Sequence, residues 1–278
     1  MNKLSLDRKA QVIKVLCEGN SIRSTARITN TAINTVVTLL KQVGAACLEY
    51  QDGNLKNLSC QRIECDEIWS FCYAKAKNVP GDKQGQFGYG DVWTFVAIDA
   101  DTKLVLSWLI GLREVESAYE FAKDIKERLS NRVQLTTDGH RMYYEAVRYA
   151  FGDDIDYAMI VKYYGNIQDQ YGRYSPPKCT QARPKLVNGS PDMKKVSTSY
   201  IERQNLTMRM SMRRFTRLTN AFSKKLENHE LALALYFMHY NFARPHKTLS
   251  NPYPKSPAMA AGITNHIWTA EEIVKLMV

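Results

Sequence analysis

The chain has 278 residues, of which 45% are hydrophobic and 24% are charged. These proportions are those of ordinary globular proteins, so they exclude a wholly disordered or fibrous chain, and the length allows one large domain or two modest ones. There are 38 Lys and Arg residues against 28 Asp and Glu, which gives a net charge of +10. A basic chain of this size favours a polyanionic partner such as nucleic acid.

Most of the positive charge lies in one segment. Between Arg173 and Lys225 there are 13 Lys and Arg residues and only two acids, Asp192 and Glu202, a net charge of +11. We interpret this density of basic residues as a track for phosphate groups rather than as an ordinary solvated surface.

Two classes of protein are disfavoured at this stage. The longest apolar runs, such as residues 231–238, are far shorter than the roughly 18 residues of a membrane-spanning helix, and the first nine residues lack the apolar core of a signal peptide. We therefore expect no membrane association and a cytoplasmic location. The six cysteines form no CxxC pair and no zinc-finger cluster, so we expect buried, reduced thiols.

The first 50 residues have helical periodicity, interrupted at Gly19-Asn20 and again before Ala32. Three short helices with tight turns predict a helix-turn-helix DNA-binding domain over residues 1–50. Its third helix would enter the major groove with three side chains near the bases and a lysine at a phosphate. These four residues are Asn34, Thr35, Thr38 and Lys41. A small helical bundle used for packing or dimerisation is the alternative.

A polar, turn-rich segment follows at residues 51–60 and is expected to be a linker. Strands are then predicted at residues 62–73, 92–99, 104–112, 133–137 and 156–163, and helices at residues 117–129 and 142–151. Three antiparallel strands followed by alternating helices and strands predict an α/β domain, residues 61–222, with a mixed sheet covered by helices on both faces.

Glycines and prolines break the chain between residues 164 and 198, where we expect a loop. A basic helix is predicted to begin at Ser199 and to include residues 215–218 in its last turns. A second, amphipathic helix is expected at about residues 224–242. It would belong to a C-terminal helical extension, residues 223–278.

Two aspartates in the predicted sheet are candidates for chemistry. Asp66 lies within an apolar strand, where an unpaired carboxylate is costly to bury, so it requires a cation. Asp138 ends a strand and precedes Gly139, which places its side chain at the edge of the sheet where active residues are common. The alternative for Asp138 is a cap on the following helix.

Glu202 lies on the basic helix, and Asn205, Arg209 and Arg213 follow on the same face at offsets of 3, 7 and 11. A competing interpretation is a capping box, because Ser199 and Glu202 have the spacing at which the glutamate binds a backbone N–H of its own helix. If Glu202 instead joins Asp66 and Asp138, the three carboxylates are suited to two divalent ions, Mg²⁺ or Mn²⁺. Such a pair promotes in-line phosphodiester displacement.

Several segments resemble DDE-type insertion-sequence transposases, most nearly those of the insertion sequence one family. The resemblance extends from about residue 60 to residue 262, and its most specific part is the block from Ser199 to Arg209, since the DDE signature has a basic residue seven positions after its glutamate. The other segments are residues 65–71, 137–140, 211–220 and 240–249. Many members of that family carry an N-terminal zinc finger before the helix-turn-helix, and here no four-ligand cluster precedes or follows Ser5.

The resemblance implies an RNase H-like catalytic domain with Asp66, Asp138 and Glu202 as the metal-binding triad and two Mg²⁺ or Mn²⁺ ions per site. It also implies double-stranded DNA partners, namely the terminal inverted repeats of an element and a target, and at least a homodimer in the active complex. Further residues expected to contact DNA are Lys194, Lys195, Arg203, Asn205, Arg209, Arg213 and Arg214.

Other residues have weaker claims. His140 is either near the metal or structural, and Glu67 should face away from Asp66 and be structural, because neighbours on a strand point to opposite sides. Tyr163 and Tyr164 are candidates for stacking on unpaired bases, whereas Trp69 is expected in the core. The predicted function is a DNA transposase that cleaves and transfers strands. The alternatives are a helix-turn-helix regulator without catalysis and an RNase H-fold nuclease.

Overall fold

The computed structural model describes residues 4–164, 179–216 and 221–277. Its strands are β1 (Arg62–Cys72), β2 (Gly90–Asp99), β3 (Val105–Gly111), β4 (Gln134–Asp138), β5 (Asp156–Tyr164) and β6 (Cys179–Asn188). Its helices are α1 (Leu6–Cys17), α2 (Ile22–Ile28), α3 (Ile33–Asn54), α4 (Val115–Arg128), α5 (Arg141–Phe151), α6 (Ser199–Ser211), α7 (Leu226–Met238), α8 (Pro257–Ala260) and α9 (Ala270–Lys275). No single helix of this described part is both long and apolar enough to cross a membrane.

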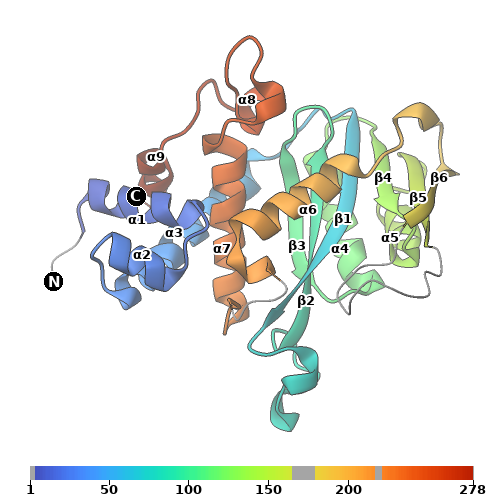
Figure 1. Ribbon diagram of the computed structural model, residues 1–278. Helices are drawn as coiled ribbons and strands as arrows, with labels where there is room; N and C mark the ends of the chain where they lie inside the picture. The colour runs from blue at the N-terminus through green and yellow to red at the C-terminus, as the bar shows by residue number, and fades with distance from the viewer. Residues whose placement is uncertain (1–3, 165–178, 217–220, 278) are drawn as a thin grey trace.

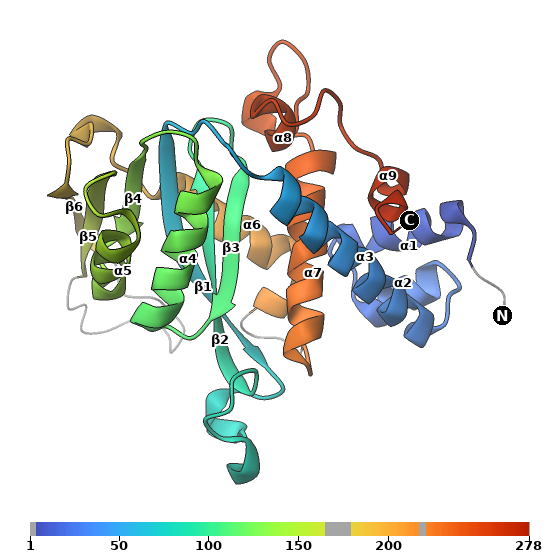
Figure 2. The ribbon, with the colours of Figure 1, turned by 180° about the vertical axis from the view of Figure 1, so that it is seen from behind.

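The six strands form one mixed sheet in the order β3-β2-β1-β4-β5-β6. β1 pairs antiparallel with β2, β2 pairs antiparallel with β3, and β4 runs parallel to both β1 and β5. Helices α4 and α5 cover one face, and α6 crosses the other (Figures 1 and 2). The predicted α/β class, a mixed sheet with helices on both faces, is therefore confirmed, and the first five strands have the order and directions of an RNase H-like sheet.

The predicted hairpin and the predicted alternation of strands and helices are confirmed. In each element, the spacing of apolar residues in the sequence matches the set of side chains that is buried. Strand β1, for example, is buried along most of its length, as expected for the central strand of a sheet covered on both faces. In α4 the residues at helical spacing, among them Phe121 and Ile125, are buried against the sheet.

The N-terminal helices are also present, and α2 and α3 are joined by residues 29–32 with a bend of 112° between them. Figure 1 shows α1, α2 and α3 on the side of α7 away from the sheet. Gly44 allows α3 to approach α7 closely, because a Cβ at this position would lie 2.4 Å from the carbonyl oxygen of Leu231. A single hydrophobic core extends from these helices through the sheet to the C-terminal helices.

Helix α3 continues to Asn54, four residues into the segment expected to be a linker. The side chain of Gln51 is buried there and donates hydrogen bonds to the carbonyl oxygens of Cys47 and Ala234, both at 3.0 Å. The contact with α7 binds the amide nitrogen of a polar side chain that the sequence pattern assigned to solvent, while its Oε1 is buried without a hydrogen-bond partner among the described residues.

The loop expected at residues 164–198 contains a strand, which corrects that prediction. β6 pairs antiparallel with β5 at the edge of the sheet and is exposed along most of its length. An edge strand accepts Pro184 and polar residues, because one side of its backbone has no partner in the sheet and neither face needs an apolar stripe. Residues 165–178, which include the start of the basic segment, lie outside the described part.

The two C-terminal helices also differ from the prediction. Helix α6 ends at Ser211, and Phe215 lies in a separate turn of 3₁₀-helix, η4 (Arg213–Phe215). Leu218, expected in the same helix, is outside the described residues. Helix α7 is buried around nearly its whole circumference rather than amphipathic, because it packs between α3 and the edge of the sheet at β3, where Trp108 contacts Phe237.

Candidate active site

Asp66 and Asp138 lie side by side on the two central parallel strands. The pairing of β1 with β4 ends at Cys65 and Thr137, so the next residue on each strand is one of the two aspartates. The carboxyl ends of parallel strands are where open α/β sheets place their ligand sites. Gly139 then lets the chain pass close to β5, because a Cβ here would lie 3.3 Å from the Cα of Val161.

Three carboxylates converge where the pairing of β1 with β4 ends. Asp66, Glu67 and Asp138 each present a carboxylate oxygen, and these oxygens lie within 4.8 Å of one another. Burial, together with smaller contributions from the negative charges of Glu67 and Asp138, raises the pKa of Asp66 to about 7. Carboxylates this close repel one another, and either a bound cation or a proton on one of them relieves the repulsion, as in metal and acid–base sites.

Glu67 is part of this group although it was expected to be structural. Its contacts do lie on the opposite face of β1 from those of Asp66, with Arg113 donating from Nε to Oε1 at 2.7 Å and the hydroxyl of Tyr143 donating to Oε2 at 3.0 Å. Burial raises the pKa of Glu67, and the neighbouring Asp138 raises it further, while Arg113 opposes both effects. Alternation along the strand predicted the face correctly but not the position of the carboxylate, which reaches the strand end where β4 stops.

Helix α6 is attached to β1 by a carboxylate that the sequence analysis did not single out. Glu64 is buried, and its Oε2 accepts hydrogen bonds from the backbone N–H groups of Tyr200 at 2.8 Å and Ile201 at 3.0 Å. These belong to the first turn of α6, whose N–H groups have no partner within the helix. Because Glu64 and Asp66 are two residues apart, they face the same side of β1, and both contact α6.

The capping box proposed for Ser199 and Glu202 is not formed. Residue Thr198 is the N-cap of α6 without a capping side-chain bond, and Glu64 serves the first turn instead. Glu202 is therefore available for other contacts: Lys162 Nζ lies 2.5 Å from its Oε1, and the hydroxyl of Thr198 donates to the same oxygen at 2.7 Å.

Glu202 does not belong to the group of three carboxylates in the described structure. It is exposed, and Lys162 on β5 pairs with it while also lowering the pKa of Asp66. The ammonium group of Lys162 therefore interacts with two of the three predicted triad members, Asp66 and Glu202, and links them electrostatically.

Asn205 was predicted to contact DNA, but its side chain is turned inward. It is buried on α6, and its Nδ2 donates to Oδ2 of Asp66 at 2.9 Å. Its Oδ1 is buried and has no hydrogen-bond partner among the described residues. The face of α6 predicted to approach the sheet is therefore present, and on it Asn205 orients the carboxylate of Asp66 rather than reaching a phosphate.

Asp138 serves the backbone with one of its oxygens. Its Oδ1 accepts from the N–H of His140 at 3.0 Å, and His140 is itself the N-cap of α5, its Nδ1 accepting from the N–H of Met142 at 3.4 Å. The strand-end aspartate thus orders the turn into α5 and belongs to the carboxylate group at the same time, which combines the two interpretations of this residue.

The donor set fits a hard divalent cation. Mg²⁺ and Mn²⁺ prefer carboxylate and carbonyl oxygens, and Asp66, Glu67 and Asp138 supply three carboxylates within reach of one ion. The orphaned Oδ1 of Asn205 adds a buried oxygen atom on a side chain already bound to Asp66. Asp66, Asp138 and Glu202 remain the predicted ligands of a pair of ions.

The predicted DNA contacts of α3 divide into two groups. Asn34 and Thr38 are exposed, and Thr35 is half-buried on the same part of the helix. Lys41 pairs with Glu227 of α7 at 2.7 Å, so the phosphate contact predicted for it must compete with this exposed ion pair.

The predicted contacts around α6 also differ in their surroundings. Lys194, Lys195 and Arg203 are exposed, although Lys195 lies 3.4 Å from a carboxylate oxygen of Asp192. Arg209 is half-buried on α6.

The two arginines that follow α6 are not on the helical face predicted for them, because the helix ends before they begin. Arg213 is exposed on η4. Arg214 donates from Nε to the hydroxyl of Ser223 at 2.8 Å, and burial lowers its pKa.

The aromatic candidates for base stacking are only partly described. Tyr163 is exposed near the end of β5, whereas the side chain of Tyr164 lies outside the described part. Trp69 is half-buried on β1 and packs against Phe71, with 5.7 Å between ring centroids, which agrees with a packing role.

Glu64, Lys162 and Arg113 belong to this site but were not predicted from the sequence. Glu64 had a usable signal, since alternation places it on the same face as Asp66. Lys162 is a lone base in an otherwise apolar and aromatic strand, which is a weaker signal. Arg113 follows β3, an edge strand that is separated from β1 by β2, and it lies 46 residues after Glu67 in the chain. Only the tertiary structure brings the two side chains together.

Comparison with known proteins gives structural similarities only. The sequence matches no protein-family model, and no curated protein matches it in sequence. Among solved structures, a Mos1 strand transfer complex is similar over 54% of this chain and 56% of its own, with 13% identity and a TM-score of 0.23. A piggyBac transposase synaptic complex with hairpin DNA is similar over 99% and 71%, with 8% identity and a TM-score of 0.45.

A pre-cleavage Mos1 transpososome is similar over 86% of this chain and 79% of its own, with 9% identity and a TM-score of 0.29. The chain spans only slightly more than half of the Mos1 chains in the first two similarities. At these levels the similarities assign neither a family nor an activity, so the functional argument rests on the site itself.

Proposed function

We propose that this protein is a DNA transposase that cleaves and transfers DNA strands with divalent cations held by Asp66, Asp138 and Glu202. The observation that carries the proposal is the group of carboxylates at the point where the pairing of β1 with β4 ends. A regulator without catalysis predicts that Asp66, Asp138 and Glu202 are separated, whereas Asp66 and Asp138 lie together and Lys162 interacts with both Asp66 and Glu202. The net charge of +11 between Arg173 and Lys225 supports a nucleic-acid substrate beside this group.

The residues of the chain have distinct tasks in this proposal. The cations would activate the attacking oxygen and stabilise the leaving oxygen of an in-line phosphodiester displacement. Asn205 orients the carboxylate of Asp66, and Glu64 fixes the first turn of α6, the helix that carries Glu202. Lys162 offsets the charge of Glu202 until a cation takes its place.

Two ion pairs on opposite faces of β1 therefore support the site. Arg113 and Tyr143 hold Glu67 from the side of α4 and α5, while Lys162 and Asn205 contact the carboxylates from the side of α6. Groups held in this way need little rearrangement when a charged substrate arrives, which is the general requirement for electrostatic catalysis.

The test is a cleavage and joining assay with a DNA element end, Mg²⁺ or Mn²⁺, and a supercoiled acceptor plasmid. Asp66→Asn, Asp138→Asn and Glu202→Gln should each lower cleavage and joining by about 10³-fold or more, since several kcal/mol of transition-state stabilisation are lost. Each variant should bind DNA as the wild type does.

Asp154→Asn is the matched control, because Asp154 is exposed on the turn before β5, at the opposite end of the parallel strands β4 and β5 from Asp138. Full strand transfer by Asp66→Asn would remove the proposed mechanism. Cleavage without joining would instead indicate a nuclease of the same fold, and DNA binding without either reaction would indicate the regulator.

A further inference from the structure

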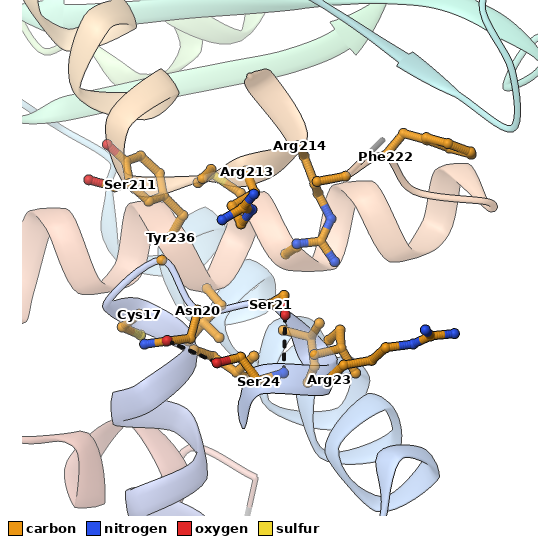
Figure 3. Close-up of a pocket in the computed structure, with 18 of the residues that line it drawn as sticks. Cys17, Asn20, Ser21, Arg23, Ser24, Ser211, Arg213, Arg214, Phe222 and Tyr236 are labelled. Carbon is orange, nitrogen blue, oxygen red and sulfur yellow. Dashed lines mark hydrogen bonds between the residues drawn. The ribbon is translucent and has the colours of Figure 1, made fainter. Parts of the chain in front are cut away.

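A cavity of about 830 Å³ lies between the N-terminal helices and the end of α6, well apart from the carboxylate group. One wall is the turn from α1 to α2 and the first turns of α2. The other is formed by Ser211, η4 and part of α7. Figure 3 shows Arg213 and Arg214 extending from η4 toward Asn20, Ser21 and Ser24 on the opposite wall.

The lining of this cavity is strongly biased in charge. Four arginines line it, and no Asp or Glu does among the described lining residues. Arg23 and Arg27 come from α2 and lie one turn apart, whereas Arg213 and Arg214 come from η4. Four like charges converging from two parts of the chain repel one another, and a bound anion would relieve this repulsion.

The arginines are positioned to bind something outside the protein. Arg23, Arg27 and Arg213 are exposed, and among the described residues none of the three forms an ion pair with a carboxylate. Only Arg214 is engaged within the chain, through Ser223. The charge therefore lies at an open mouth rather than in an enclosed pocket.

The two walls are held at a fixed separation. Gly19, with φ of +77°, brings the turn after α1 against the end of α6, where a Cβ would lie 2.8 Å from the carbonyl oxygen of Ser211. Ser24 donates to Asn20 at 3.4 Å, and its N–H donates to the hydroxyl of Ser21 at 3.1 Å, which orders the turn (Figure 3).

We infer that this cavity binds the phosphodiester backbone of DNA and carries it from the N-terminal helices to the catalytic helix. An arginine guanidinium binds phosphate through two parallel hydrogen bonds, and arginines spread over two walls suit a polymer better than a single small anion. In helix-turn-helix proteins the first helix of the pair crosses the DNA backbone, and α2, with Arg23 and Arg27, has that position beside α3. The inference rests on the proposed function only in taking DNA as the polyanion.

The distance from the cavity to Glu202 along α6 fits this path. Ser211 is nine residues from Glu202 on α6, a separation of about 14 Å at 1.5 Å per residue. That length corresponds to about four base-pair steps of duplex DNA. A strand held by the arginines at one end of α6 therefore reaches Glu202, near the other end, within a few nucleotides.

The test is DNA binding by the full chain carrying Asp66→Asn, so that cleavage does not interfere. The probe is a fluorescein-labelled duplex of about 30 base pairs, titrated at several salt concentrations. Arg23→Gln, Arg27→Gln and Arg213→Gln combined should raise Kd at least tenfold and reduce the slope of log K against log salt by about 2.7, since each phosphate contact contributes about 0.9.

The matched control removes the same charge elsewhere. Lys123→Gln, Arg148→Gln and Lys275→Gln combined alter exposed residues of α4, α5 and α9, none of which lines the cavity. This control should change Kd by less than about threefold and the slope by less than one. Arg213→Gln alone should give about a third of the combined slope change, and thermal unfolding should show all variants folded.

Equal weakening by the two triple variants, or no weakening by the cavity variant, would overturn the inference. So would displacement of the duplex by a mononucleotide at equal phosphate concentration, which would indicate a small-anion site. Failure of the proposed function is separate: if no form cleaves DNA but the cavity arginines govern binding, the inference stands alone. If the wild type cleaves and the cavity variant binds like the control, only the inference fails.

Discussion

The two ends of α6 meet the rest of the protein in opposite ways. At its N-terminal end, the polar groups are matched by partners from the chain itself: Glu64 binds the first N–H groups, Asn205 binds Asp66, and Lys162 pairs with Glu202. At its C-terminal end, four arginines gather around a cavity without a carboxylate among its described lining residues.

The helix dipole favours a negative charge at the first end and positive charges at the second, so both arrangements agree with helix electrostatics. The difference lies in what remains unmatched. The acidic end has an excess of carboxylates that a cation would relieve, and the basic end has guanidinium groups that an anion would relieve. A single helix thus carries the two complementary requirements of a metal-dependent reaction on DNA.

Breaking the attachment of α6 to β1 should have the largest effect. Glu64→Ala removes the acceptor of two backbone N–H groups, which costs about 1–3 kcal/mol, and should lower strand cleavage by about 10–100-fold while DNA affinity changes less than about twofold. Glu64→Gln retains an acceptor oxygen and should recover most of the cleavage rate. Equal losses of cleavage and DNA affinity would show that Glu64 only maintains the fold.

The contact at the other end of α6 is tested through Gly19. Gly19→Ala forces a side chain into a left-handed backbone conformation and against Ser211, which should lower the free energy of unfolding by about 2–3 kcal/mol. Urea denaturation measures it. Gly53→Ala is the control, because a Cβ at Gly53 has no neighbour within 4 Å, and its unfolding free energy should change by about 0.5 kcal/mol or less.

Removing the internal cation from the acidic end should strengthen metal binding. Lys162→Met leaves Glu202 and Asp66 without an ammonium group that repels an incoming divalent ion, so Mn²⁺ affinity should rise by about tenfold. Isothermal titration calorimetry of the wild type and the variant, with Lys123→Met as a surface control, measures the difference. Unchanged or weaker binding would show that Lys162 is not a competitor of the metal.

A buried histidine near the basic end of α6 makes the stability of the protein depend on pH. His229 lies between Ser70 and Phe215, and burial, with a smaller contribution from the charge of Arg214, lowers its pKa from 6.5 to about 3. Below pH 6.5 the unfolded chain takes up a proton that the folded chain refuses. The stability that His229 provides at neutral pH is therefore lost at about 1.4 kcal/mol per pH unit as the pH falls toward 3.

Urea unfolding of the wild type and His229→Gln at pH 7, 6 and 5 tests this expectation. The difference in unfolding free energy between the two proteins should shrink as the pH falls, because the variant lacks the titrating ring. A constant difference over this range would contradict the assigned burial of a neutral imidazole.

Much of the fold was predictable because it depends on patterns that neighbouring residues share. The alternation in β1 and the helical spacing in α4 each reflect which side chains are buried, and burial is the dominant local constraint. The strand β6 and the burial of α7 were not predictable in this way. An edge strand needs no apolar stripe, and a helix surrounded by other elements has no polar face.

In the candidate site, too, some features could be predicted from local sequence and others depend on tertiary contacts. The sequence predicted Asp66, Asp138 and Glu202 as the site, because their residue types and positions relative to strand ends and a basic helix are visible locally, and the structure places Asp66 and Asp138 together. It offered no basis for choosing between Glu202 as a helix cap and Glu202 as a functional carboxylate. That choice depends on Glu64, which lies 138 positions away and supplies the cap through a tertiary contact.

The sequence by itself determined the class of the protein, the order of most of its elements and the chemistry that its acidic and basic residues favour. The tertiary structure alone decided which charges meet: Glu67 with Asp66 and Asp138, Lys162 with Glu202, and arginines of α2 with those of η4. The physical reason is that burial patterns repeat over a few residues, whereas electrostatic partners are set by distances in space between segments far apart in the chain.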